Sequence, residues 1–245
     1  MRLHVTGATG YLGSELVRRA PDASVERVEV RDAAAVRELL ERVRPEVVIH
    51  TAYRQDGPGA YEINVDGSKN VARAAAAVGA RLLHLSTDVV FDGRKGAPYD
   101  EDDPVSPVTD YGRAKAEAER RVAGAHPDAL LVRTSLLYGG AAPSKHELAA
   151  GDPGFTFFTN EIRSPVQVGD LAAALLELAD ADVSGLLHVG GAEPVSRAAF
   201  AELLAGRPVA CGPAPETRPL DCSLDSSRAQ SLLRTRLRGV REVLG

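Results

Sequence analysis

Short apolar runs alternate along the chain with segments whose apolar residues recur every three or four positions. Runs such as Leu3-His4-Val5 and Val47-Val48-Ile49 are typical of buried strands, and the periodic segments between them are typical of amphipathic helices. Because strands that alternate with helices usually build a parallel sheet with helices on its faces, the pattern predicts an α/β fold. The predicted strands are 3–5, 25–30, 47–49, 81–85, 129–132 and 186–189. The predicted helices are 11–20, 33–43, 61–78, 111–123, 170–179, 196–204 and 226–233.

The composition is that of a folded protein rather than a disordered or fibrous one. The chain has 245 residues, of which 44% are hydrophobic and 26% charged, and a protein of this size buries roughly 70% of its surface. The formal net charge is −5 and no basic block is present, which argues against nucleic acid or a membrane as the main partner. Cys211 and Cys222 have the spacing of neither a disulfide framework nor a zinc site. The sequence before the first predicted strand has no pattern of a targeting signal. We therefore expect a cytoplasmic globular protein.

A glycine-rich turn, Thr6-Gly7-Ala8-Thr9-Gly10-Tyr11-Leu12-Gly13, follows the first strand and opens the first helix. This order of elements is what a dinucleotide-binding turn requires, although the spacing is GxxGxxG rather than GxGxxG. Gly7 permits the tight turn, Gly10 permits the backbone to approach a pyrophosphate, and Gly13 permits close packing of helix against strand. Because a helix N-terminus offers N–H groups to phosphates, we predict NADPH or NADH as the cofactor.

Two interpretations of the segment 25–30 predict different residues at the ribose end of the cofactor site. An acidic residue about 20 positions after the turn usually reads the ribose hydroxyls, and Glu29 or Asp32 has that spacing. If 25–30 is the second strand, Arg31 and Asp32 lie at the ribose end. If it is the third strand, the element that reads the 2′-position is absent. The preference between NADH and NADPH stays open.

A second pattern, Tyr111-Gly112-Arg113-Ala114-Lys115, opens a predicted helix and places Tyr111 and Lys115 one turn apart on the same face. An ammonium near a phenol favours the phenolate and lowers the phenol's pKa from about 10, which suits proton transfer at neutral pH. Tyr111 is therefore a candidate acid–base residue at a carbonyl or alcohol. Thr87 follows the predicted strand 81–85 and is a candidate to hydrogen-bond the reacting oxygen, because ligands of α/β sheets bind outside the carboxyl ends of strands.

Together with Ser86-Thr87-Asp88-Val89-Val90-Phe91-Asp92-Gly93, these motifs resemble the extended short-chain dehydrogenase/reductases, and most closely the dTDP-4-dehydrorhamnose reductase group. The likeness continues through Arg133-Thr134-Ser135, Arg163-Ser164-Pro165-Val166 and Arg218-Pro219, so it covers nearly the whole chain. It implies a doubly wound, Rossmann-like parallel sheet with a small C-terminal substrate lobe. The implied boundaries within a single unit, 1–245, are approximately 1–138 and 166–191 for the NAD(P)-binding core and approximately 139–165 and 192–245 for the substrate lobe.

The resemblance also implies an activity, the reduction of a 4-keto-6-deoxy nucleotide sugar by NAD(P)H. It assigns Thr87 to orient the keto oxygen, Tyr111 to donate the proton, and Lys115 to adjust Tyr111 and hold the nicotinamide ribose. The residues expected to bind the cofactor are Gly7, Thr9, Gly10, Tyr11, Leu12, Gly13, Glu29, Val30, Ala52, Tyr53, Ser86, Lys115 and Thr134. The residues expected to bind the substrate are Asp88, Val89, Leu136, His146 in a predicted loop, and Arg218, whose guanidinium suits a phosphate. No metal is expected.

Three departures from the family pattern leave the substrate open. Val89 stands where the reductases carry an aromatic residue, Leu136 stands where they carry Trp, and the segment 54–59 is short. These positions frame the sugar in the family. Two alternatives to a reductase also stay open, a non-catalytic NAD(P)- or nucleotide-binding regulatory protein on the same scaffold and a sugar-nucleotide epimerase. Two partners are expected. One is a small-molecule substrate, namely a nucleotide sugar, and the other is a second copy of the chain in a homodimer.

Overall fold

The computed structural model describes all 245 residues, and the chain forms two compact units. Unit 1 comprises Met1–Ser86, Asp110–Val132 and Leu175–Leu186. Unit 2 comprises Thr87–Thr109, Arg133–Ala174 and Leu187–Gly245. Compactness does not reveal what each unit binds, so the division into a cofactor-binding core and a substrate lobe stays a prediction.

A five-stranded sheet with the order β1-β2-β3-β4-β9 confirms the predicted α/β fold. β1 pairs in parallel with β2, and β2 pairs in parallel with β3. Every residue of β1 and β2 is buried. This agrees with their apolar runs, which lack polar alternation and are typical of strands covered on both faces. The strands are β1 (Leu3–Thr6), β2 (Val47–His50), β3 (Arg81–Thr87), β4 (Leu130–Thr134) and β9 (Gly185–His188).

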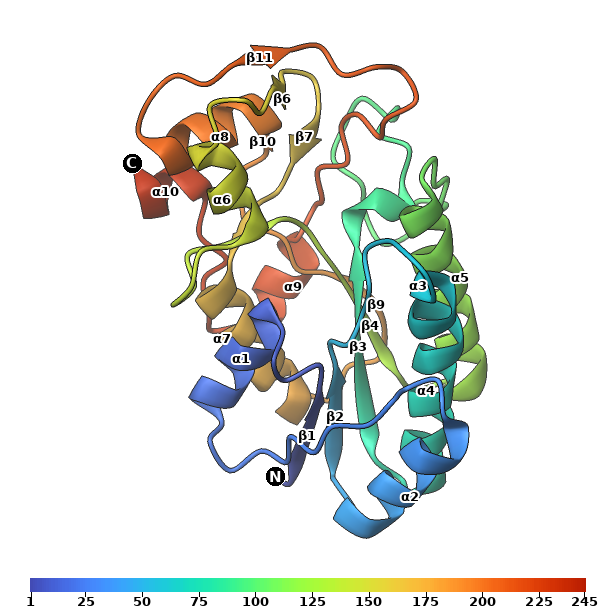
Figure 1. The fold of residues 1–245 in the computed structure, drawn as a ribbon. Helices are drawn as coiled ribbons and strands as arrows, with labels where there is room; N and C mark the ends of the chain where they lie inside the picture. The colour runs from blue at the N-terminus through green and yellow to red at the C-terminus, as the bar shows by residue number, and fades with distance from the viewer. The chain divides into compact units, whose positions relative to one another are not determined.

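Helices cover both faces of the sheet in unit 1. Figure 1 shows α1 (Tyr11–Arg19) on one face and α2 (Ala33–Val43), α4 (Ser68–Ala77) and α5 (Asp110–Ala125) on the other. α2 begins where the Asp32 carboxylate accepts hydrogen bonds from two first-turn N–H groups, as a good N-cap does. The helical segment before α4 is divided into α3 (Ala60–Glu62) and a π-helical turn, η1 (Ile63–Gly67). The apolar faces of α2 and α4 pack with the sheet into one core, which includes Val36, Leu40, Val71, Val48 and Leu82.

The prediction of a strand at 25–30 is wrong. The chain forms a parallel bridge to His4 at Ser24, immediately before the segment, and β1 is the last strand on that side. The Val30 side chain packs into the core beneath α4, where a Cβ on Gly67 would lie only 2.6 Å from Val30 Cγ2. The amide of Asn70 donates a hydrogen bond to the Val30 carbonyl at 3.1 Å. Because the Asn70 side chain donates to the Val30 carbonyl, this carbonyl needs no hydrogen bond from a neighbouring strand.

Unit 2 contains short strand pairs that the sequence pattern did not predict, together with the helices predicted at 196–204 and 226–233. Two-residue strands are too short to show alternation, so their pairing is evident only in the structure. The pairs are β5 (Leu137–Tyr138) with β8 (Val166–Gln167), β6 (Phe157–Phe158) with β11 (Cys211–Gly212), and β7 (Ile162–Arg163) with β10 (Val195–Ser196). The other elements are η2 (Asp88–Val90), α6 (Lys145–Gly151), α8 (Arg197–Ala205), α9 (Ser227–Leu232) and α10 (Val240–Leu244), while α7 (Val168–Asp180) belongs partly to each unit.

The predicted loop around His146 is also wrong, because this residue lies in the first turn of α6. The Ser144 hydroxyl accepts a hydrogen bond from the Glu147 N–H, and the Glu147 carboxylate accepts one from the Ser144 N–H. This reciprocal capping box starts the helix and fixes the position of His146. No helix of the protein combines the length and the apolar character needed to cross a membrane.

Candidate active site

The glycine turn of unit 1 has the close backbone approach that a dinucleotide needs. Gly7 adopts a φ of +70°, and a Cβ at this position would lie 2.7 Å from the backbone nitrogen of Ala52. A Cβ at Gly13 would lie 2.1 Å from the carbonyl oxygen of Gly7. Gly10 is the N-cap of α1 and has no side chain that could occupy the N-terminus of the helix. This arrangement fits a pyrophosphate, because a bare helix N-terminus offers N–H donors and the positive end of a dipole.

The residues expected around the rest of the cofactor lie in different surroundings. Ala52 lies against Gly7, and the Tyr53 ring lies 6.1 Å from the Tyr111 ring, measured between centroids. The Glu29 carboxylate instead pairs with the Arg31 guanidinium at 2.8 Å, and the hydrogen bonds from Arg31 lower the pKa of Glu29 to about 2. Val30 is buried in the core. The structure therefore brings Ala52 and Tyr53 to the turn and to Tyr111, whereas Glu29 and Val30 make contacts within the protein.

The helix α5 carries both Tyr111 and Lys115. It starts at Asp110, whose negative charge suits a helix N-terminus, and it continues through alanines and charged residues that favour helix. Pairs one turn apart, such as Glu117 with Arg120 and Arg121, stabilise its outer face. The same helix buries Lys115, which is 3% exposed. A lysine at this depth is unusual and needs a specific set of partners.

The partners of Lys115 are neutral acceptors. Its Nζ donates to the carbonyl oxygen of Leu85 at 2.6 Å and lies 3.4 Å from Nε2 of His84. Burial lowers the pKa of Lys115 to about 8, although the charge of Glu119 acts in the opposite direction. Ser86, expected to bind the cofactor, donates its hydroxyl hydrogen to the Glu119 carboxylate. Lys115 therefore combines a fixed position with a pKa near the neutral range.

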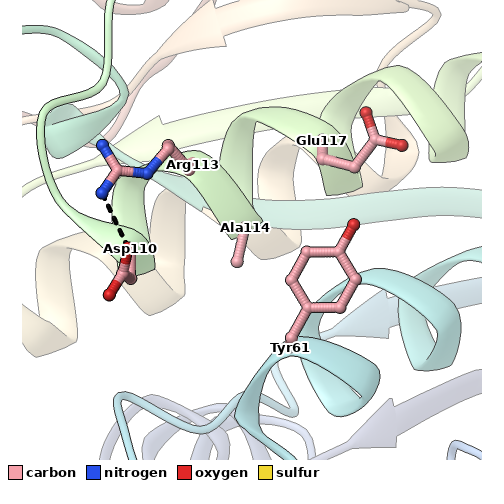
Figure 2. Close-up of a pocket in the computed structure, with 5 residues that line it drawn as sticks. All are labelled: Tyr61, Asp110, Arg113, Ala114 and Glu117. Atoms are coloured by element: carbon pink, nitrogen blue, oxygen red, sulfur yellow. Dashed lines mark hydrogen bonds and ion pairs between the residues drawn. The ribbon is translucent and has the colours of Figure 1, made fainter.

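A hollow of about 530 Å³ lies on the outer side of α5. Figure 2 shows Asp110, Arg113, Ala114 and Glu117 along this helix and the ring of Tyr61 facing them from α3. The Arg113 guanidinium pairs with the Asp110 carboxylate at 2.7 Å across the first turn. Neither Tyr111 nor Lys115 lines the hollow, so it is separate from the predicted acid–base pair.

In unit 2, the residues that follow β3 form a tight polar turn. The Thr87 hydroxyl accepts a hydrogen bond from the Val89 N–H at 3.4 Å and donates one to the Asp88 carboxylate at 3.2 Å. The Asp88 side chain is 2% exposed, accepts a hydrogen bond from the Ser135 hydroxyl at 2.6 Å and lies 3.7 Å from the Arg163 guanidinium. Burial raises the pKa of Asp88, and the Arg163 charge opposes this effect. Asp88 thus joins three segments of unit 2.

Two further predicted residues are held inside unit 2. The Thr134 hydroxyl donates a hydrogen bond to the Val189 carbonyl at 2.7 Å, and Thr134 is buried. Leu136 packs against a core cluster formed by Tyr138, Val195, Phe200 and Val240. Their assignments to cofactor and substrate stay predictions.

His146 and Arg218 lie in a group of arginines. Nδ1 of His146 lies 3.3 Å from the Arg197 guanidinium, and burial lowers the pKa of His146 to about 3, so its imidazole is neutral and accepts from Arg197. The Arg218 guanidinium pairs with Glu161 and lies 5.1 Å from the centre of the Phe158 ring. Burial, followed by the charge of Arg163, lowers the pKa of Arg197 to about 10. The structure therefore collects cationic side chains around two predicted substrate residues.

Three residues of this group were not among the predicted site residues: Glu161, Arg163 and Arg197. Arg163 is 2% exposed and lies within 3.8 Å of Glu161 and 3.7 Å of Asp88. We call Asp88, Glu161, Arg163, Arg197 and Arg218 the arginine cluster. It contains one more positive than negative charge. The sequence signal for one of them was the motif Arg163-Ser164-Pro165-Val166, which carried the family resemblance without a role for Arg163.

The parallel sheet, the glycine turn and the helix with Tyr111 and Lys115 define the class of NAD(P)-dependent oxidoreductases with a Rossmann-like fold. Comparison over the whole chain identifies the family within this class. The chain belongs to the RmlD substrate binding domain family, whose sequence profile matches residues 1–244. The resemblance to the dTDP-4-dehydrorhamnose reductase group, predicted from the motifs, is thereby confirmed.

Similar proteins carry names that agree with this family. A dTDP-4-dehydrorhamnose reductase from Mycobacterium tuberculosis (strain CDC 1551 / Oshkosh) is 38% identical, and the match covers 80% of this chain and 72% of that protein. The crystal structure of dTDP-4-dehydrorhamnose reductase from Bacillus anthracis, in complex with NADP, superposes with a TM-score of 0.87 at 26% identity and covers 99% of this chain and 96% of that chain. That complex supports the predicted cofactor class. Methionine adenosyltransferase 2 subunit beta from Bos taurus is 30% identical and covers 94% of this chain and 82% of that protein.

Proposed function

We propose that the protein is an NAD(P)H-dependent reductase that acts on a keto group of a nucleotide-activated 4-keto-6-deoxy sugar. The observation that carries the proposal is the buried Lys115, one turn after Tyr111 on α5, bonded only to neutral acceptors. A lysine in this environment has a pKa close to neutral pH, and its charged form lowers the pKa of a neighbouring phenol. The names of the relatives support the substrate class.

The glycine turn provides the cofactor site in this proposal. Gly7, Gly10 and Gly13 leave room for the pyrophosphate, and the N-terminus of α1 binds it. Ala52, beside Gly7, and Tyr53, beside Tyr111, line the path toward the reacting end. When bound, the cofactor supplies the hydride.

The side chains of this chain supply the proton. The Tyr111 hydroxyl donates its proton to the carbonyl oxygen as the alcohol forms, and the charged Lys115 stabilises the phenolate that remains. Lys115 also donates a hydrogen bond to a ribose hydroxyl. The resemblance assigns to Thr87 a hydrogen bond that orients the keto oxygen. In the structure the Thr87 hydroxyl donates to the Asp88 carboxylate.

The arginine cluster provides the site for the phosphates of a nucleotide sugar. The Arg197 guanidinium lies 3.3 Å from Nδ1 of the neutral His146 and close enough to Arg163 and Arg218 for their charges to lower its pKa. A diphosphate beside Arg197 and Arg218 would compensate the excess positive charge and accept bidentate hydrogen bonds. Phe158, already under the Arg218 guanidinium, adds an aromatic face near this position.

Isothermal titration of the purified protein with NADPH and, separately, with NADH tests the first requirement. We expect micromolar binding of at least one of them, followed by turnover of a keto-sugar nucleotide with the preferred cofactor. Tyr111→Phe should then reduce turnover by about 10²–10⁴-fold while cofactor affinity barely changes, because the ring is kept and only the proton donor is removed. Equal turnover in the variant and the wild type would contradict the assignment of Tyr111.

A non-catalytic binding protein is the second candidate. The segment 25–30 forms no strand, and the bovine relative is named as a subunit of another enzyme. A folded protein that binds neither cofactor would favour this candidate. An epimerase would instead retain oxidised cofactor through purification, which absorbs near 340 nm only after reduction. Light scattering tests the proposed homodimer.

A further inference from the structure

The polar residues around Lys115 form a column across three adjacent strands of unit 1. His50 on β2 lies opposite His84 on β3 in the strand register, and Thr6 on β1 lies opposite His50. The two imidazole rings stack with their centroids 5.3 Å apart. His50 and His84 are each 1% exposed. Neither histidine was among the predicted site residues.

The hydrogen bonds of His50 define its tautomer. The Ser68 hydroxyl donates to the carbonyl oxygen of Asn64 at 2.7 Å, so at its 3.1 Å contact it accepts from Nε2–H of His50. Nδ1 of His50 is left to accept from the Thr6 hydroxyl at 2.6 Å. Both nitrogens of His50 are therefore satisfied within the protein, and neither contacts Lys115.

The environment of His84 is different. Its Nε2 lies 3.4 Å from Nζ of Lys115, and its buried Nδ1 has no hydrogen-bond partner. An ammonium has only donors, so Nε2 must be the acceptor and Nδ1 must carry the proton. Burial, followed by the charge of Lys115, lowers the pKa of His84 well below its usual value, so the ring stays neutral at neutral pH. A buried N–H without a partner is costly, and the arrangement is maintained despite that cost.

Titratable groups lie near Lys115 on two strands and on its own helix. Glu119 is the nearest carboxylate on α5, and it is occupied by the hydroxyl of Ser86. Apart from that, only the Leu85 carbonyl and His84 contact the ammonium. The groups are His50 on β2, His84 on β3 and Glu119 on α5, with Tyr111 one turn before Lys115 on the same helix.

We propose that His84 is a positioning residue, whose neutral Nε2 orients the Lys115 ammonium and favours its charged form. The inference rests on the proposed function, because only there does Lys115 act on Tyr111. With His84 Nε2 as a second acceptor beside the Leu85 carbonyl oxygen, two of the three N–H bonds of Lys115 have a fixed direction. The third N–H is then directed to a ribose hydroxyl or to the phenolate. His84 touches neither cofactor nor substrate in this role.

The test measures the titration of Lys115 without substrate or cofactor. The chain contains four lysines, Lys69, Lys95, Lys115 and Lys145, so protein labelled with ¹³C at lysine Cε gives a simple NMR spectrum. The signal that is lost in Lys115→Arg identifies Lys115. In His84→Leu we expect the pKa of Lys115 to fall by about one unit, since a hydrogen bond that favours the charged form is removed. His84→Gln keeps an acceptor at the position of Nε2 and should restore most of the fall.

His50→Gln is the matched control, because it changes the stacked neighbour on β2 and leaves the contact with Lys115 in place. Its Lys115 titration should equal that of the wild type. An unchanged Lys115 titration in His84→Leu, or an equal fall in His50→Gln, would overturn the inference. Should His84→Leu fail to fold, ¹⁵N spectra of wild-type histidines still decide, because a protonated Nε2 on His84 contradicts the proposed acceptor.

Turnover provides the second measurement. If Lys115 must be charged, the alkaline limb of the kcat profile moves to lower pH in His84→Leu by the same amount as the NMR titration, and His84→Gln reverses the movement. A limb that stays in place while the NMR titration moves would overturn the functional part of the inference. A wild-type protein without turnover, whose Lys115 titration nevertheless responds to His84, would contradict the proposed function and support the contact itself.

Discussion

Two buried cations, Lys115 in unit 1 and Arg163 in unit 2, are held in opposite ways. Lys115 is 3% exposed and is bonded to a carbonyl oxygen and lies beside a neutral imidazole. Arg163 is 2% exposed and lies between the carboxylates of Asp88 and Glu161, while its guanidinium also donates to carbonyls of the chain, one of them that of Pro219 at 2.8 Å. A carboxylate keeps a buried cation charged, whereas a cation buried beside neutral acceptors alone has a lowered pKa, because burial disfavours its charged form.

The difference indicates two roles. Arg163 crosslinks the segments around β7 and the turn after β3 through ion pairs and hydrogen bonds. Lys115, with a pKa of about 8, changes its protonation near neutral pH, which a structural crosslink does not require. We therefore expect substitutions of Arg163 to affect stability first and substitutions of Lys115 to affect chemistry first.

The largest effect on stability is expected for Arg163→Met. The variant leaves Asp88 and Glu161 buried without their shared cation, and breaking a buried pair in this way costs about 3–5 kcal/mol. Urea unfolding measures the loss. Arg236→Met, which removes an exposed pair with Glu242, is the control and should cost less than about 1 kcal/mol. A small loss in Arg163→Met would show that the two carboxylates do not depend on it.

Lys115→Met should separate activity from stability. The substitution removes a buried charge that has no carboxylate partner, so we expect the free energy of unfolding to change by about 1 kcal/mol. Turnover should fall by about 100-fold or more, because the phenolate of Tyr111 loses its nearby cation. Parallel unfolding and kinetic measurements decide. A loss of stability as large as in Arg163→Met would remove the distinction between the two cations.

His50→Gln should change how stability depends on pH. Burial, followed by the charge of Lys115, lowers the pKa of His50 to about 3 in the folded protein, against about 6.5 when unfolded. Because protons then bind preferentially to the unfolded chain, this contribution to stability is complete above pH 6.5 and is lost as the pH falls from there toward 3. The wild type should lose about 1.4 kcal/mol more than the variant per pH unit in this window. Equal slopes between pH 6 and 5, measured by urea unfolding, would contradict the burial of a neutral imidazole.

The smallest effect on stability is expected for Arg218→Met. This side chain is 47% exposed, and its partner Glu161 keeps Arg163 nearby, so the loss should be about 1 kcal/mol or less. Affinity for a nucleoside diphosphate, measured by calorimetry, should nevertheless fall by about tenfold. Unchanged affinity would place the phosphates away from the arginine cluster.

Much of unit 1 could be predicted from the sequence. The helix 33–43 has the predicted bounds, and the strands that begin at Leu3, Val47 and Arg81 were recognised, because long periodic segments and buried apolar runs are strong local signals. The glycine turn was recognised from its order after a strand and before a helix. The prediction of a strand at 25–30 failed for a tertiary reason, since Val28 and Val30 also suit an extended chain that packs under α4 and bonds to Asn70.

The sequence by itself determined the class of fold, the glycine turn, and the one-turn spacing of Tyr111 and Lys115, because each depends on residues close together in the chain. Only the tertiary structure decided what surrounds them. The contact between His84 and Lys115 joins residues 31 positions apart, and the pair of Arg218 with Glu161 joins residues 57 positions apart. Charge and burial at such contacts arise from packing between distant segments, and no local pattern encodes which acceptor a buried cation will meet.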